Sequence, residues 1–297
     1  MREGSTRSSR RLIINADDYG LSRGVNVGII EAAERGVVTS ASMIVNLHGF
    51  DDAVARGQSS PSLSLGLHLN LTTGKPLTEV RSLTRRRTGQ FYPLPTLIAR
   101  ATFGRVDPSE VAQECTAQID RMMEAGFVPT HLDSHRHVHA HPALWPSVVQ
   151  AAASRGVSNV RVPSEPFWAN ARDWRATLKK TAMLMCTRRA RREGNANGSK
   201  HFFGISLQGG SAFAARMFAL IPNLPSGTSE LMTHPGHADA ALAEHDAYTW
   251  QREAELKVLC SPGLRDLLAR CDIELVSFGN LVSPGTNLVS PGTLRAP

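Results

Sequence analysis

A chain of 297 residues with 41% hydrophobic content is long enough for one large α/β domain and too apolar for a disordered or fibrous protein. Its 33 Lys and Arg against 26 Asp and Glu give a net charge of +7, which suits a nucleic-acid, anionic-membrane or acidic-substrate partner without deciding among them. The four cysteines form no C-x-x-C pair, and no segment approaches the roughly 20 apolar residues that span a bilayer. We therefore expect a cytoplasmic protein without a signal peptide, a zinc knuckle or a disulfide framework.

The first part of the chain has the pattern of strands alternating with helices. A flexible tail is expected over residues 1–10, and a buried strand over 11–16 leads directly into Asp17 and Asp18. The elements expected next are a helix over 24–36, a strand over 40–45, a short helix over 51–56 and a strand over 63–71. Leucines alternate with other residues in the last strand, so His68 should lie on the face opposite the leucines.

The segment 73–105 is rich in Gly, Pro and Arg, which predicts an insertion or lid loop. The elements expected after it are a helix over 107–125, a strand at 131–139, a helix over 143–155, a strand over 160–162, a basic helix over 170–192, a loop over 195–210, a helix over 211–220, a strand over 231–233, a helix over 250–270 and a strand over 273–278. The whole of 11–280 is then one domain. Residues 281–297 continue a short repeated sequence and are expected to be a disordered tail.

The stretch from residue 131 to 141 carries the densest chemistry in the chain. If it is a strand, then His131, Asp133, His135, His137 and His139 all point to one face. Neighbouring same-face positions lie about 6.6 Å apart along a strand, so two of these groups can share one ion and three or more hardly can. Most of the stretch is therefore expected to support a site rather than to form one alone.

Alternating strands and helices predict a parallel α/β fold, and about seven such units suit a distorted (β/α) barrel that resembles a TIM barrel. Asp17, Asp18, His68, His135 and His234 then all fall at the carboxyl ends of predicted strands. Parallel barrels assemble their active sites at that end. The sequence therefore predicts one site built from several strands.

One carboxylate and two imidazoles can bind a divalent ion and leave positions open for water and substrate, as a hydrolase requires. Of the adjacent pair Asp17 and Asp18, one could bind the ion while the other accepts a proton from water. Each residue could also have an ordinary structural role: the Asp pair could cap a helix, His68 could be a core histidine, and His234 could lie in a loop without a catalytic function.

Five segments together resemble the YdjC-like (ChbG-type) carbohydrate deacetylase family. They are NADDYG at 15–20, TSAS at 39–42, GLHLNL at 66–71, PTHLDSHRHVH at 129–139 and HP at 234–235. The resemblance implies a distorted (β/α) barrel and removal of an acetyl group from an N-acetylated amino sugar. It implies Asp18, His68 and His135 as ligands of one divalent ion, with Zn²⁺ expected first and Mg²⁺ or another ion as alternatives. It also implies Asp17 as the base and His234 as the acid.

Supporting or substrate-binding roles are expected for Tyr19, Asp133, Arg161, His131, His137 and His139. Arg161 in particular could orient the base or bind substrate, with a surface salt bridge as the structural alternative.

A narrower resemblance is to the hopanoid-biosynthesis-associated (HpnK) branch, through RVPSEP at 161–166, the basic helix at 170–192 and HFFG at 201–204. It would make the substrate an N-acetylglucosaminyl hopanoid lipid. The basic helix would suit contact with the inner face of a membrane, but an ordinary barrel helix with a solvated basic face explains it as well.

The sequence leaves other functions open. A soluble chito-oligosaccharide is the alternative substrate, and a two-metal hydrolase such as a phosphoesterase is the alternative enzyme. A basic membrane- or nucleic-acid-binding module would not explain acidic and imidazole groups gathered at strand ends, so no nucleic acid is expected. The oligomeric state is left open, a homodimer included.

Overall fold

The computed structural model describes residues 9–169, 177–178, 180–181, 183–184, 187–193, 199–208 and 212–281. Of the basic helix predicted over 170–192, residues 170–176, 179, 182, 185 and 186 lie outside the described residues. The same is true of most of the two tails predicted over 1–10 and 281–297. Among the described residues no helix is both long and apolar enough to cross a membrane.

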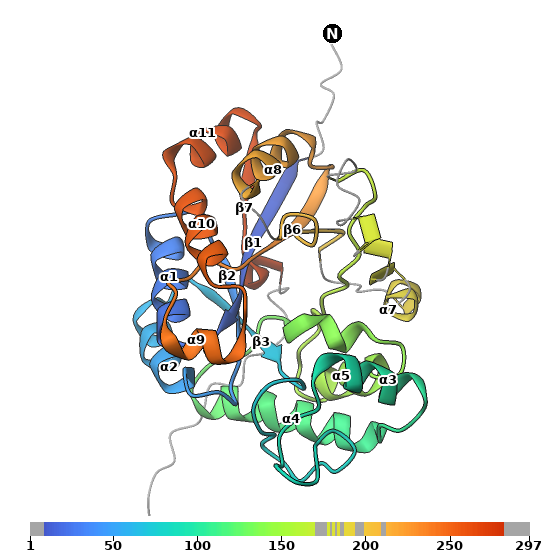
Figure 1. Ribbon diagram of the computed structural model, residues 1–297. Coiled ribbons are helices and arrows are strands. Elements are labelled where there is room, and N and C mark those ends of the chain that lie inside the picture. Colours follow the sequence, from blue (N-terminus) through green and yellow to red (C-terminus); the bar gives the residue numbers. More distant parts are fainter. Residues whose placement is uncertain are drawn as a thin grey trace, which may run out of the picture.

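The fold is a distorted half-barrel of parallel strands in a single domain (Figure 1). The strands are β1 (Arg10–Tyr19), β2 (Ser40–Met43), β3 (Ser64–Leu69), β4 (Leu132–Ser134), β5 (His201–Phe203), β6 (Gly227–Thr233) and β7 (Ile273–Leu275). Every strand pair is parallel, and the sheet runs in the order β4-β3-β2-β1-β6-β5. The expected parallel barrel is therefore confirmed in a half-closed form.

β1 is the central strand because it has neighbours along its full length. It pairs with β6 over Arg10–Ala16, with β7 at its start and with β2 at its end. The side chains of Leu12, Ile13 and Ile14 are fully buried, as expected of a strand covered on both faces. β1 continues to Tyr19, three residues beyond the strand predicted over 11–16, so Asp17 and Asp18 lie within it and not after it.

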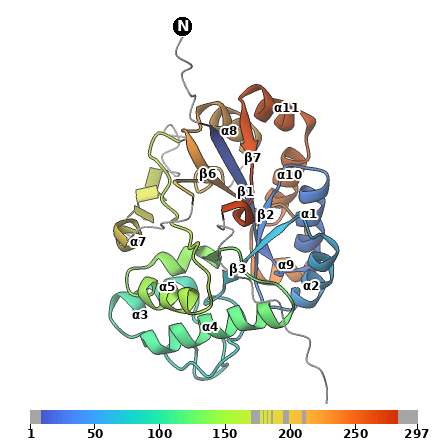
Figure 2. The same ribbon diagram turned by 180° about the vertical axis from the view of Figure 1, so that it is seen from behind.

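Helices cover the outside of the sheet. They are α1 (Arg23–Glu34), α2 (Phe50–Ser59), α3 (Leu94–Thr102), α4 (Pro108–Glu124), α5 (Trp145–Ser154), α7 (Arg188–Glu193), α8 (Phe213–Leu220), α9 (Ala240–His245), α10 (Trp250–Leu259) and α11 (Pro262–Arg270). Figures 1 and 2 show α1, α2, α9 and α10 along one flank and α3, α4 and α5 grouped on another. The carboxyl ends of the strands are left to form the site between these groups.

α4 illustrates how the sequence makes these helices. Asp107 caps its first turn by accepting a hydrogen bond from the Ser109 amide, and Pro108 occupies the first helical position, where no amide donor is needed. The buried positions Val111, Cys115, Ile119 and Met122 recur every three or four residues and form the face that packs on the core. The predicted boundaries of this helix are confirmed.

Several expected elements differ from the structure. The segment predicted as a loop over 73–105 contains α3, and the loop predicted over 195–210 contains β5. The helix predicted over 250–270 is two helices, because Ser261 caps a new turn and Pro262 has no amide to continue the first. The strand predicted over 160–162 is reduced to a single bridge between Val160 and Leu132. α9 was not predicted.

The largest correction concerns the His-rich stretch. Its strand is only Leu132–Ser134, and the chain then enters a 3-10 helix, η1 (His135–Ala140). Arg136 and His137 have positive φ angles of 59° and 54°, which turn the backbone away from the strand direction. The prediction that five alternate side chains share one strand face is therefore wrong. Of the five residues only Asp133 lies in the strand, whereas His135, His137 and His139 lie in η1.

Candidate metal centre and catalytic pocket

The two adjacent aspartates are directed apart by an irregularity in β1. The register between β1 and β2 shifts between Ala16 and Tyr19, and Asp18 has a φ of 72°. Gly20 follows at φ 94°, where a Cβ would lie 2.2 Å from the Ile44 carbonyl oxygen, so only glycine fits this turn. The bulge lets consecutive carboxylates contact different partners.

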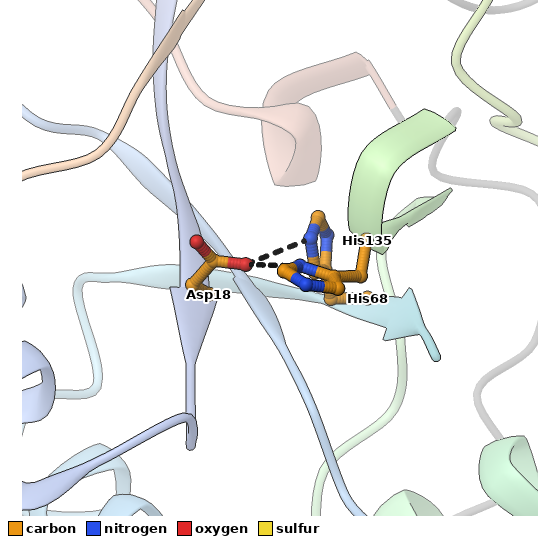
Figure 3. Close-up of side chains that lie close together, drawn as sticks. All are labelled: Asp18, His68 and His135. Carbon is orange, nitrogen blue, oxygen red and sulfur yellow. Dashed lines mark hydrogen bonds and ion pairs between the residues drawn. The ribbon is translucent and has the colours of Figure 1, made fainter. Parts of the chain in front are cut away.

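Asp18 meets two imidazoles at the end of the half-barrel (Figure 3). Its Oδ1 lies 2.9 Å from His135 Nδ1 and 3.2 Å from His68 Nε2. All three side chains are buried, and their ligand atoms lie within 4.8 Å of one another. His135 Nε2 is buried and has no hydrogen-bond partner among the described residues. Asp18, His68 and His135, called the metal cluster below, can hold one divalent ion.

The donor set fits such an ion. One carboxylate and two imidazoles match the ligands that zinc and similar ions take in hydrolases, with positions left for water and substrate. His68 is oriented from behind, because its Nδ1 lies 2.7 Å from Asp133 Oδ1, the usual arrangement for a ligating histidine. Without an ion, burial opposes protonation of His68, but the Asp133 charge beside it raises its pKa to about 10.

A second group of possible ligands, formed by Asp17, His68 and Asp133, is already occupied by an arginine. The Arg161 guanidinium lies 2.6 Å from a carboxylate oxygen of Asp17 and 2.6 Å from one of Asp133. A cation therefore already balances these two carboxylates, which favours one ion over two.

Arg161 pairs with three buried carboxylates beside the site. Its two terminal nitrogens donate to both oxygens of Asp17 at 2.6 and 2.8 Å, and its Nε donates to Glu230 on β6 at 2.6 Å. Burial alone would raise the pKa of Asp17, but the Arg161 charge outweighs it and lowers that pKa below its ordinary value. Asp17 is thus a fixed anion beside the metal cluster.

Arg252, on α10, contacts the other aspartate. Its Nη2 donates to Asp18 Oδ2 at 2.6 Å and to Asp246 Oδ2 at 2.7 Å. Burial opposes ionisation of Asp18, but Arg252 and His135 lower its pKa well below the ordinary value. The Asp18 carboxylate is therefore ionised and available as a ligand near neutral pH.

His234 follows β6 directly and lies across the same pocket. Its backbone amide donates to Glu255 Oε2 at 2.6 Å, and its ring meets the Tyr248 ring edge-on with 5.7 Å between centroids. The side-chain amide of Gln208 lies 3.2 Å from its Nε2. Tyr248 and Gln208 thus contact the His234 ring, and Glu255 fixes its backbone.

A pocket of about 490 Å³ joins these groups. Its lining includes Asp17, Asp18, His68, His135 and His234 together with Arg136, His137, Met183, Ile205, Gln208, Met232, Asp246 and Tyr248. The strand ends therefore meet at one cavity, which is large enough for a sugar residue.

The other predicted site residues lie around this pocket and not all in it. Tyr19 is in the core, and its hydroxyl donates to the Ala53 carbonyl at 2.7 Å. His131 stacks on Phe278 below the site, 3.9 Å between ring centroids. His139 is bonded to Ser134 and to the Arg161 carbonyl. His135 and His137 line the pocket, whereas His139 does not.

The sequence analysis missed Arg252, Glu255, Asp246, Tyr248 and Gln208. A signal for the first two was present. The buried positions of α10 are Arg252, Glu255, Leu256 and Leu259, a three-and-four spacing typical of a core-facing stripe. Charged residues at core-facing positions indicate buried ion pairs, whereas the remaining three lie in loops with no such pattern.

Comparison with known proteins agrees with this geometry. Residues 11–270 match the family model described as YdjC-like protein. The chain is 37% identical to a carbohydrate deacetylase of Brevibacillus brevis, with 91% of this chain and 99% of that protein covered. It is 36% identical to a chitooligosaccharide deacetylase of an Enterobacter species, with 91% and 98% covered.

A solved structure is also similar. It belongs to an Enterococcus faecalis protein described as a candidate cellobiose-phosphate cleavage protein, with a TM-score of 0.77, 26% identity, and 93% of this chain and all of that chain covered. The family match spans every strand of the half-barrel except β7, and every residue of the metal cluster. This chain therefore belongs to the YdjC-like protein family.

Proposed function

We propose that this protein is a metal-dependent carbohydrate deacetylase that removes the N-acetyl group from an N-acetylated amino sugar of the chito-oligosaccharide class. The observation that carries the proposal is the buried cluster of Asp18, His68 and His135 beside the Arg-bound Asp17, at the end of an open pocket. The deacetylases among its relatives support the same reaction class.

An ion bound by Asp18, His68 and His135 would polarise the acetamide carbonyl and acidify the attacking water. Zn²⁺ is the ion we expect, because its usual ligands include both imidazole and carboxylate. Asp133 would keep His68 in the tautomer that presents Nε2 to the ion, since its oxygen accepts the Nδ1 hydrogen.

Asp17 would act as the general base. It is ionised, and Arg161 holds both of its oxygens, so its position changes little when it accepts a proton from water. The water oxygen bonds to the carbonyl carbon, and the carbon–nitrogen bond then breaks.

His234 would act as the general acid from the opposite wall of the pocket. Its imidazolium gives a proton to the departing nitrogen, so that the products are acetate and a free amino sugar. Tyr248 and Gln208 beside its ring would keep it directed toward the pocket.

The hopanoid lipid of the narrower resemblance has no support among these relatives, whose descriptions are of carbohydrate and chitooligosaccharide deacetylases. We therefore favour the soluble chito-oligosaccharide. The structure describes the basic segment over 170–192 only in part, and this segment gives no support for a lipid substrate.

The test is acetate release by purified, zinc-loaded protein from a panel of substrates: N-acetylglucosamine, its β-1,4-linked dimer and trimer, and a lipid-linked N-acetylglucosamine. We expect release from the dimer or trimer and none after chelation. Release from the lipid-linked sugar alone would reverse the choice of substrate class. No release from any member would refute the deacetylase assignment.

A further inference from the structure

Helix α10 buries two charged side chains beside the site. Arg252 and Glu255 are 0% and 1% exposed and share the core-facing stripe with Leu256 and Leu259. Burying charged groups is unfavourable unless each has a partner. Their partners are therefore informative about the purpose of this helix.

The partners of Arg252 come from two places. Nη2 donates to Asp18 Oδ2 at 2.6 Å and to Asp246 Oδ2 at 2.7 Å, while Nε donates to the Tyr248 carbonyl at 2.9 Å. Asp18 belongs to the metal cluster, and Asp246 and Tyr248 line the pocket. One guanidinium therefore joins the metal cluster to the pocket wall.

The two carboxylate oxygens of Asp18 contact different groups. Oδ1 faces His68 and His135, whereas Oδ2 is taken by Arg252. A carboxylate with one oxygen bound to a guanidinium has only the other to offer an ion. Asp18 would therefore contribute a single ligand atom and leave more of the coordination shell for water and substrate.

Glu255 connects the same helix to the wall and to His234. Its Oε1 accepts the Tyr248 hydroxyl at 2.5 Å, and its Oε2 accepts the His234 amide at 2.6 Å. α10 thus contacts both sides of the pocket through two side chains three residues apart.

We propose that Arg252 is a positioning residue that restricts Asp18 to one ligand oxygen and, through Asp246 and Tyr248, ties the substrate-facing wall to the metal centre. The inference rests on the metal site of the proposed function and adds a specific role to a residue of that site. It predicts that metal coordination and substrate affinity both depend on Arg252, while Asp246 affects only the second.

The first readout requires no catalysis. Metal-free wild-type protein, Arg252→Met and Asp246→Asn are each loaded with Co²⁺, and the visible absorption bands are recorded. In Arg252→Met, the freed Oδ2 should join the shell, raise the coordination number and lower the band intensity roughly twofold. Asp246→Asn should keep the wild-type spectrum, because Arg252 still holds Asp18.

The second readout is the KM for the chito-oligosaccharide with zinc-loaded protein. It should rise about tenfold in both variants, which is the size of effect expected when a supporting contact is lost. In Asp246→Asn, kcat should stay close to the wild-type value. The Co²⁺ spectra test the proposed metal site and the role of Arg252 separately. A wild-type protein that binds no Co²⁺ refutes the proposed metal site, whereas wild-type binding with an unchanged Arg252→Met spectrum refutes only the role of Arg252.

Folding of each variant is checked by thermal unfolding of the metal-free protein. If Arg252→Met does not fold, then Arg252→Lys replaces it. A lysine keeps the charge but lacks the planar fork that donates to Asp18, Asp246 and the Tyr248 carbonyl together. At least one of the two readouts should then change, and wild-type values for both would overturn the proposal.

Discussion

Two buried arginines hold the two adjacent aspartates of β1, and their surroundings differ. The inner arginine cluster is Arg161 with Asp17, Asp133 and Glu230, in which every side chain is at most 2% exposed. The outer arginine cluster is Arg252 with Asp18 and Asp246, and the Asp246 side chain is 22% exposed. The carboxylates of the inner cluster all come from strands, whereas the outer cluster combines Asp18 of β1 with Arg252 of α10 and Asp246 of a loop.

This difference indicates a division of roles. Strand neighbours and full burial leave the side chains of the inner cluster few alternative conformations, which suits the fixed position we propose for Asp17 as the base. The outer cluster ends at a loop on the pocket wall, which can adjust when substrate enters. Three carboxylates around one guanidinium also leave the inner cluster negative. Burial, together with Asp133 and Asp17, raises the pKa of Glu230 to about 7 even though Arg161 opposes the rise.

The comparison between the two clusters predicts that removal of Arg161 lowers the free energy of unfolding most. Arg161→Met leaves three buried carboxylates without their common partner, and a broken buried pair typically destabilises by about 3–5 kcal/mol. Urea unfolding of the metal-free protein measures the loss. Arg252→Met is the matched control and should lose less, because Asp246 can turn toward water. Equal losses would show that the clusters do not differ in this way.

Asp17→Asn should have the next largest effect, on catalysis. The amide has the same shape but cannot accept the proton, so kcat should fall roughly 10³-fold, about 4 kcal/mol in the barrier. Arg161 keeps Asp133 and Glu230 as partners, and the metal cluster is untouched. Acetate release and bound zinc are measured together. Near wild-type turnover with full zinc content would remove Asp17 from the role of base.

The stability of the inner cluster should decrease in acid. The ring of His139 is hydrogen-bonded to the Arg161 carbonyl, and burial lowers the pKa of this histidine from 6.5 to about 4. Between these values the unfolded chain binds a proton that the folded chain does not, so the free energy of unfolding falls as the pH drops from 6.5 to 4. One such histidine accounts for about 3 kcal/mol over that range.

His139→Gln removes this contribution and should make the pH dependence shallower, as measured by urea unfolding between about pH 7 and 4. Identical slopes for His139→Gln and wild type would contradict the assignment of His139.

The smallest of these effects is a loss of turnover on substitution of His234, which lies beside the loop wall of the pocket. His234→Gln should lower kcat about 10²-fold, because water can replace a general acid in part. The deficit should shrink for an acetanilide with an electron-poor ring, whose leaving nitrogen needs less protonation. A deficit of the same size for both substrates would argue that His234 does not donate the proton.

The sequence was sufficient for the outline of the site. Strand periodicity and the parallel topology placed Asp18, His68 and His135 at strand ends, together with Asp17 and His234. The family resemblance then selected the first three as ligands, and the structure brings them together. The His-rich strand was wrong because Arg136 and His137 adopt left-handed conformations, which no local pattern of hydrophobic residues indicates. Arg252 contacts Asp18 across 234 positions of sequence, and such pairings depend on how β1 and α10 pack.

The central claim is that one ion on Asp18, His68 and His135 supports the reaction. The most direct test is titration of zinc into metal-free protein while acetate release from the N-acetylglucosamine dimer is followed. We predict a rise in proportion to added zinc that stops at one equivalent per chain, and no rise in His68→Asn. A plateau at two equivalents, or full release in the presence of a chelator, would contradict it.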